Sequence, residues 1–140
     1  MKNIVLKRRI SMLIILLILM LSVSSCAGKG DTDLDLTKMS DTLRYSTVVD
    51  MNQNPKNYLG KSVLISGTYY KSYFDETQNY YHFVTGLDDT GCCSWGYEFI
   101  LDESQFSYPA EDAQITLHGT IRSYTELDIV YYYIDVDRME

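Results

Sequence analysis

Two adjacent cysteines, Cys92 and Cys93, are the residues of this chain that point most directly to chemistry. Thiolates bind zinc and cuprous copper, and thiols can also be oxidised to a disulfide. His82 precedes them on the same stretch of chain, and a hairpin centred near Asp88 and Asp89 would bring its imidazole within reach of the pair. The sequence therefore predicts Cys92, Cys93 and His82 as a candidate metal site for zinc or copper.

Three interpretations of the cysteine pair remain open. A metal site is the first, although a closed zinc site needs four ligands in tetrahedral geometry. The second is a disulfide between neighbours, strained and easily reduced because adjacent α-carbons lie only about 3.8 Å apart. In the third, one thiol is buried, the other is half-exposed and neither does chemistry. Because side chains alternate along a strand, both thiols reach one ligand only if Gly91 or Gly96 allows a bulge or loop.

Tyrosine is unusually frequent, with 13 in the chain. Strand alternation places some of these rings outward, where an aromatic face can stack on sugars or pack against a peptide. Tyrosine is also simply a good strand former, so the enrichment has a purely structural explanation as well. The predicted second and third strands give a candidate ligand-binding face that consists of Tyr80, Tyr81, His82, Trp95 and Tyr97.

Catalysis finds little support in the residue pattern. No nucleophile stands at a recognisable spacing from a base, and the serines have no evident partner. The carboxylate pairs Asp75-Glu76 and Asp88-Asp89 fall in predicted turns, where acidic residues are expected for turn formation alone. We therefore expect a protein that is not an enzyme.

Hydrophobic alternation predicts a helix followed by five strands. The helix begins near Ser40 and ends at Asn54-Pro55, and the strands cover approximately residues 62–74, 80–86, 92–101, 114–124 and 130–136. Gly67 is a position where the long first strand can bend sharply enough to serve two sheets. This order predicts an all-β fold, a small five-stranded OB-like barrel preceded by a short helix. A six-stranded meander or a small sandwich is the alternative.

The N-terminus predicts export and anchoring. Basic residues at positions 2–9, an apolar run over 10–23 and then small residues describe a secretory signal peptide over residues 1–25. The ending Val23-Ser24-Ser25-Cys26 resembles the lipobox of bacterial lipoproteins, which implies acylation of Cys26 and a place on the outer face of the cell membrane. An uncleaved membrane anchor is the alternative. Residues 26–39 are predicted to form a flexible tether, and residues 40–140 the OB-like domain.

Charge excludes one class of partner. Four of the 12 basic residues precede Cys26, so a chain that begins there keeps eight basic residues against 19 acidic ones, a net charge of −11. Such a surface repels phosphate backbones, so we expect no nucleic acid. The two cysteines that remain are neighbours and cannot join distant parts of the fold, which must rely on its hydrophobic core.

A family resemblance covers approximately residues 45–136. Its residues are Asn54-Pro55, Tyr58, Gly60-Lys61, Val63, Gly67, Gly91-Cys92-Cys93, Gly96, Glu98-Phe99 and His118-Gly119. In these positions the chain resembles uncharacterised OB-fold lipoproteins of Gram-positive bacteria. The resemblance implies the fold and the extracytoplasmic location, and it implies no activity.

Three functional hypotheses follow from the sequence. The first is a membrane-anchored binding module for a cell-envelope protein, peptide or glycan. The second is a metal-handling or thiol redox-sensing lipoprotein that uses Cys92 and Cys93, with His82 as an auxiliary ligand. The third is a structural accessory of a membrane complex.

Overall fold

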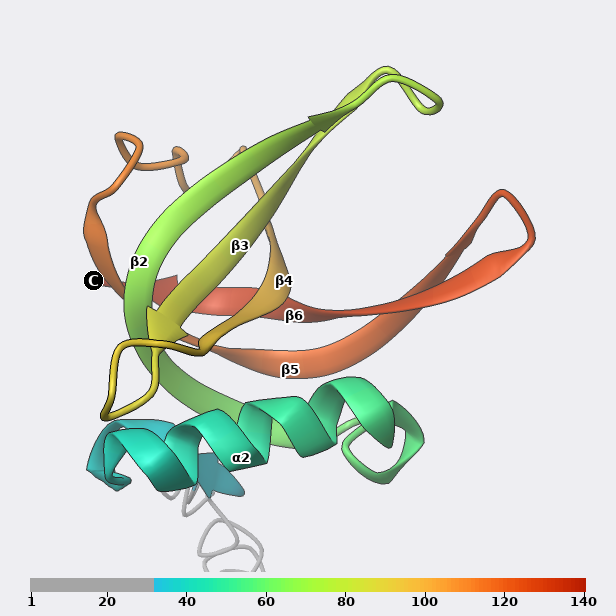
Figure 1. Ribbon diagram of the computed structural model, residues 1–140. Coiled ribbons are helices and arrows are strands. Elements are labelled where there is room, and N and C mark those ends of the chain that lie inside the picture. Colours follow the sequence, from blue (N-terminus) through green and yellow to red (C-terminus); the bar gives the residue numbers. More distant parts are fainter. Residues whose placement is uncertain (1–31) are drawn as a thin grey trace, which may run out of the picture. The chain divides into compact units, whose positions relative to one another are not determined.

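Long β-strands dominate the computed structural model, which describes residues 32–140 (Figure 1). The predicted signal peptide, the acylated Cys26 and the first part of the predicted tether lie outside the described residues. Within residues 32–140, none of the helices has the length and apolar character needed to cross a membrane.

Five of the strands pair in a closed ring. They are β2 (Ser62–Phe74), β3 (Asn79–Leu87), β4 (Ser94–Leu101), β5 (Gln114–Glu126) and β6 (Ile129–Met139). Their order in the sheet is β2, β3, β4, β6, β5, and β5 pairs again with β2. Only the pairing of β4 with β6 is parallel within this ring. The prediction of a mostly β fold with one preceding α-helix is therefore confirmed.

The first long strand has two partners in one sheet, whereas the sequence predicted a bend at Gly67 that would serve two sheets. Residues 62–68 of β2 pair with β5, and residues 68–74 pair with β3. Gly67 lies at the changeover, where a Cβ atom would stand 2.4 Å from the carbonyl oxygen of Thr85. No side chain fits at that distance, so glycine permits the close approach of the two backbones. Figure 1 shows how strongly β2 curves as a result.

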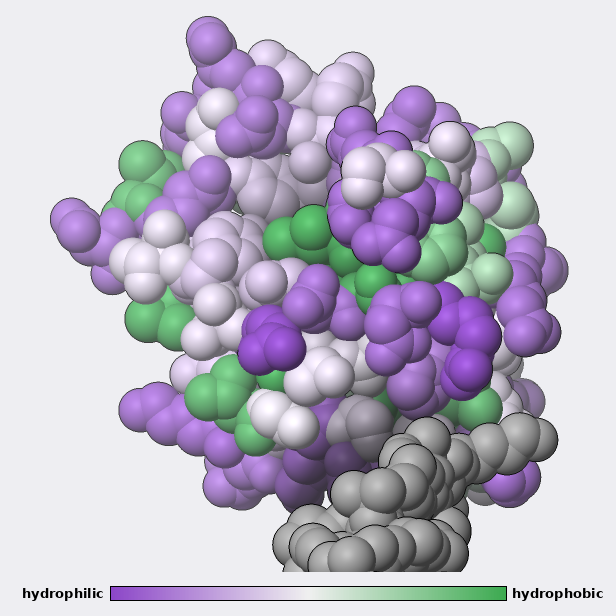
Figure 2. Space-filling model, turned by 180° about the vertical axis from the view of Figure 1, so that it is seen from behind, coloured by the Kyte–Doolittle hydropathy of each residue, from purple (hydrophilic) through white to green (hydrophobic). Residues whose placement is uncertain are grey.

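Inward-facing residues of the strands make the core. On β5, Ile115, Leu117 and Ile121 are buried, as their alternation predicts. Large apolar side chains are also exposed, including Phe74 and Leu127 at the hairpin ends. Figure 2 shows one face of the molecule, where hydrophobic residues, in green, gather in patches between hydrophilic residues, in purple.

The helix α2 (Asp41–Gln53) begins and ends where the sequence predicts. The Ser40 side chain accepts a hydrogen bond from the Leu43 amide at 3.3 Å, which caps the first turn. Pro55 follows the helix and cannot continue it. Val48 and Met51 are fully buried and attach α2 to the sheet, whereas Leu43 faces outward.

The folded unit starts earlier than the predicted boundary at residue 40. A short strand, β1 (Leu34–Asp35), pairs in parallel with β2, and the 3-10 turn η1 (Leu36–Lys38) follows. The sheet therefore has six strands in the described residues, not the predicted five. Leu36 is fully buried, because apolar residues alternate with the acidic ones in this segment. Residues 32–39 thus belong to the domain and shorten any tether.

The predicted third strand begins too early. β4 starts at Ser94, so Cys92 and Cys93 lie in the loop 88–93 instead of in a strand. The register of the hairpin places Leu87 opposite Ser94 and Thr85 opposite Gly96, so neither cysteine has a partner on β3. Pairing Val84 with Tyr97 buries both side chains in the core, which explains why this register is preferred.

Candidate functional site

An open groove of about 720 Å³ lies between the β2–β3 and β5–β6 hairpins. Both hairpins project from the ring toward the same side of the molecule (Figure 1). Their tips contribute Glu76 and Thr77 on one side and Leu127 on the other. The groove therefore has two arms and, between them, a floor supplied by β3 and β4.

Seven of the residues that line the groove are aromatic. The first three strands of the ring supply Tyr70, Phe74, Tyr81, Phe83 and Trp95, and the second hairpin supplies Tyr124 and Tyr131. Tyr124 and Tyr131 stack with their ring centroids 5.5 Å apart. Alternation explains most of the arrangement: Tyr69, Val84 and Tyr97 point into the core, so their strand neighbours point into the groove. Trp95 is the exception, because it shares the inward face of Tyr97 and is buried in the core while also lining the groove.

Two tyrosine–glutamate hydrogen bonds connect the parts of the groove. The Tyr124 hydroxyl on β5 donates to Glu98 Oε1 on β4 at 2.9 Å. The Tyr81 hydroxyl on β3 donates to the Glu126 carboxylate on β5, and it also lies 2.8 Å from the Thr77 hydroxyl. These bonds fix the rings and leave carboxylate oxygens at the groove surface.

Burial dominates the electrostatics of the groove. It raises the pKa of Glu98, the nearby Glu126 charge adds to this effect, and the hydrogen bond from Tyr124 opposes it. The pKa of Tyr124 is raised first by burial and then by its hydrogen bond to Glu98. Among the described residues that line the groove, three are glutamates and none is basic. The groove thus suits neutral or positively charged groups that donate hydrogen bonds.

The residues of the predicted ligand-binding face do not form one surface in the structure. Tyr81 and Trp95 line the groove. Tyr80 points away and is exposed, with its ring 5.0 Å from that of Tyr73. Tyr97 is buried in the core, and its hydroxyl has no hydrogen-bond partner in the described residues. Neighbouring strand residues alternate between faces, so Tyr80, Tyr81 and His82 cannot share one surface.

His82 belongs to an aromatic cluster on the other side of β3. Its Nδ1 lies 2.7 Å from the Tyr69 hydroxyl, and its ring stacks on Tyr108 with centroids 3.6 Å apart. Burial lowers the pKa of His82, with the positive charge of Lys71 as a smaller contribution and the Glu103 charge opposing. Packed in this way, the neutral imidazole helps to attach residues 102–113 to the sheet, because Tyr108 belongs to that connection.

Sequence reasoning missed Glu98, Tyr124 and Tyr131 as parts of one surface. For Glu98 a signal exists, because it follows the inward-facing Tyr97 and must point the opposite way. For Tyr124 and Tyr131 the sequence predicts a strand position only. Whether these two tyrosines come close to β4 depends on the direction in which the β5–β6 hairpin runs past that strand.

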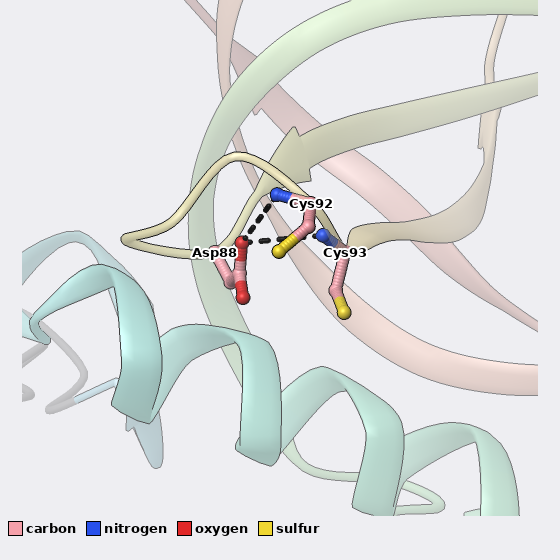
Figure 3. A group of neighbouring side chains, drawn as sticks. All are labelled: Asp88, Cys92 and Cys93. Atoms are coloured by element: carbon pink, nitrogen blue, oxygen red, sulfur yellow. Dashed lines mark hydrogen bonds between the residues drawn. The ribbon is translucent and has the colours of Figure 1, made fainter.

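The cysteines lie at a second location, the loop 88–93. Asp88 Oδ1 accepts hydrogen bonds from the amides of Cys92 and Cys93 at 3.1 and 3.2 Å (Figure 3). The pKa of Asp88 is lowered first by its hydrogen bond from Thr90, then by backbone amides of the loop, while partial burial opposes. Both cysteines are free and exposed.

The predicted metal set of Cys92, Cys93 and His82 does not come together. The loop instead gathers Asp88, Cys92 and Cys93, with one ligand atom of each within 4.8 Å of the others. His82 stands five residues before Leu87, the last residue of β3, which is about 17 Å along a strand. The hairpin register is the reason, since it places the cysteines beyond the strand end.

Comparisons of the chain with models of protein families, with curated proteins and with solved structures find no match.

Proposed function

We propose that this protein is a membrane-anchored, extracytoplasmic lipoprotein whose OB-like barrel binds a neutral glycan of the cell envelope in the aromatic groove. The lipid anchor is Cys26, on the argument of the signal peptide and lipobox pattern. The acidic surface and groove leave nucleic acid out of the proposal.

The pairing of the strands supports the barrel. A closed ring in which the first strand pairs with the second and fourth, and the third pairs in parallel with the fifth, is the connectivity of an OB fold when β2–β6 are counted as its five strands. In that fold ligands bind against the second and third strands, between the loop that joins the first two strands and the loop that joins the last two. The groove lies between the corresponding hairpin tips.

The composition of the groove carries the choice of ligand. Exposed rings such as Tyr70 offer flat apolar faces that pack against the faces of sugar rings. The carboxylates of Glu98 and Glu126 accept hydrogen bonds from sugar hydroxyls, and they repel anionic ligands. Catalysis is not part of the proposal, because a binding groove accounts for these residues without it.

A binding titration with a matched pair of variants tests the proposal. The fragment that begins at Gly28 keeps the whole folded unit of residues 32–140. We expect soluble oligomers of N-acetylglucosamine to change its tryptophan and tyrosine fluorescence in a saturable way. Tyr70→Ala, which removes a groove ring, should weaken binding by about tenfold, the effect of losing roughly 1.4 kcal/mol of aromatic contact.

Tyr73→Ala is the matched control. Tyr70 and Tyr73 are on the same strand and are equally exposed at 48%, yet only Tyr70 lines the groove. We expect Tyr73→Ala to bind like the wild type. Equal losses in the two variants, or no response to any neutral oligosaccharide, would contradict the proposal.

A further inference from the structure

The loop 88–93 holds its two thiols in a fixed arrangement. Asp88 closes the loop from both ends, because its side chain accepts the amides of Cys92 and Cys93 while its own amide donates to the Cys93 carbonyl at 2.9 Å. A regular strand would send the two side chains to opposite faces, but this loop does not. Both sulfurs therefore lie within 4.8 Å of each other and of the Asp88 carboxylate.

The neighbouring residues leave both sulfur atoms exposed and contact one of them. The Thr90 hydroxyl lies 2.8 Å from Cys92 Sγ. On the other side, the loop is attached to α2, since the Thr42 hydroxyl donates to the Asp89 carboxylate. Figure 3 shows the Cys93 side chain directed toward α2, and the charge of its thiolate is the first cause that raises the pKa of Tyr45 on that helix. Hydrogen bonds within the loop and to α2 thus hold the loop in place.

We propose that Cys92 and Cys93 bind a soft, thiophilic cation, cuprous copper, with Asp88 positioning the two ligands. Two thiolates satisfy cuprous copper, which accepts low coordination numbers and prefers sulfur. Zinc favours four ligands, and calcium and magnesium favour oxygen, so the donors gathered here suit those ions less well. Binding leaves copper in its cuprous state and releases the proton of each thiol that becomes a ligand.

The site is independent of the glycan groove. None of Asp88, Cys92 and Cys93 lines that groove. Because both thiols are exposed, the ion would exchange with other carriers instead of being enclosed as a structural metal. The inference therefore points to a lipoprotein that receives copper and passes it on at the outer face of the cell membrane. This role does not depend on which ligand the groove binds.

Competition with a chromogenic chelator tests the inference. The fragment from Gly28, reduced and free of oxygen, is added to copper(I) held by bathocuproine disulfonate, and the loss of colour reports transfer. We expect about one copper per chain, as two thiolates in a single loop can hold one ion. Cys92→Ser and Cys93→Ser should each abolish the transfer, and circular dichroism should show that these exposed positions tolerate serine.

Three further variants test the role of Asp88 and provide two controls. Asp88→Asn should weaken copper binding by about 10- to 100-fold, as loss of a supporting partner does at other metal sites. His82→Gln and Glu98→Gln should bind copper like the wild type, the first because His82 is remote from the loop and the second because it belongs to the groove. Absence of transfer to the wild type, undiminished transfer to a Cys92→Ser, Cys93→Ser double variant, or tighter retention of zinc than of copper would overturn the inference.

Discussion

At the scale of single residues, burial decides what each aromatic or ionisable group does. Tyr97 and Tyr70 are chemically identical, yet one is enclosed in the core and the other is an open face of the groove. Burial raises the pKa of Tyr97 to about 12, so its hydroxyl stays neutral. Cys92 and Cys93 are the opposite case, because their exposure leaves them free to react or to bind.

The lowered pKa of His82 should make the free energy of unfolding depend on pH. Its pKa is lowered from the ordinary value of 6.5 in the folded state, chiefly by burial. The unfolded chain therefore binds a proton at pH values where the folded protein does not. The free energy of unfolding should fall as pH drops below about 6.5, and this loss should level off below the folded-state pKa.

Urea denaturation at about pH 7.5 and pH 5.5 measures the effect of His82. His82→Phe keeps a ring against Tyr108 and should reduce the fall. Glu98 changes the free energy of unfolding in the opposite direction as pH falls. Its pKa is raised in the folded state, so on acidification the folded protein takes up this proton before the unfolded chain does. The comparison of wild type with His82→Phe isolates the histidine. An unchanged fall in His82→Phe would contradict the prediction.

At the scale of secondary-structure elements, the short segment before α2 is part of the fold. β1 adds an edge to β2, and η1 inserts Leu36 into the core. The Asp33 carboxylate accepts hydrogen bonds from the Ser62 amide and hydroxyl at 2.8 and 2.7 Å. A segment tied down in this way cannot act as a flexible tether.

A pair of leucine substitutions checks the role of this segment. Leu36→Ala should lower the free energy of unfolding by about 2–5 kcal/mol, because it leaves a cavity in the core. Leu43→Ala, at an exposed position on α2, should change it by no more than about 0.5 kcal/mol. Chemical denaturation of both variants gives the comparison. If Leu36→Ala were as mild as Leu43→Ala, residues 32–39 would not be part of the core.

At the scale of the whole molecule, one chain carries two separate candidate sites behind a predicted anchor. The groove lies between two hairpins, and the thiol loop joins β3 to β4 beside α2. Both sites lie at ends of paired strands, the groove between two hairpins and the thiol loop at the β3–β4 turn. A lipid anchor would hold both sites close to the membrane surface.

The anchor gives a prediction for the intact protein. Cys26→Ala should abolish incorporation of labelled palmitate and move the protein out of the membrane fraction of its native host, since a covalent lipid is the attachment we propose. The Cys92→Ser, Cys93→Ser double variant should keep both the label and the membrane location. Membrane retention of Cys26→Ala without label would instead indicate an uncleaved apolar segment as the anchor.

Sequence alone predicted the features that depend on near neighbours. Ser40 and Pro55 mark the ends of α2, because a cap and a helix break act within a few residues. Alternation over residues 62–69 and 115–121 identified the inward faces of β2 and β5. Gly67 was recognised as a point where β2 can bend, since glycine allows a bend that other residues resist, and the structure places the change of partners beside it.

Only the tertiary structure decided which residues meet across the chain. The β3–β4 register, chosen by joint burial of Val84 and Tyr97, moved the cysteines out of the strand and away from His82. The crossing of the β5–β6 hairpin brought Tyr124 to Glu98, a contact between residues 26 positions apart. Strand register and hairpin crossing minimise the free energy of the whole sheet, so no local pattern specifies them. The sequence by itself thus determined the elements and their faces, whereas the composition of both sites followed from long-range pairing.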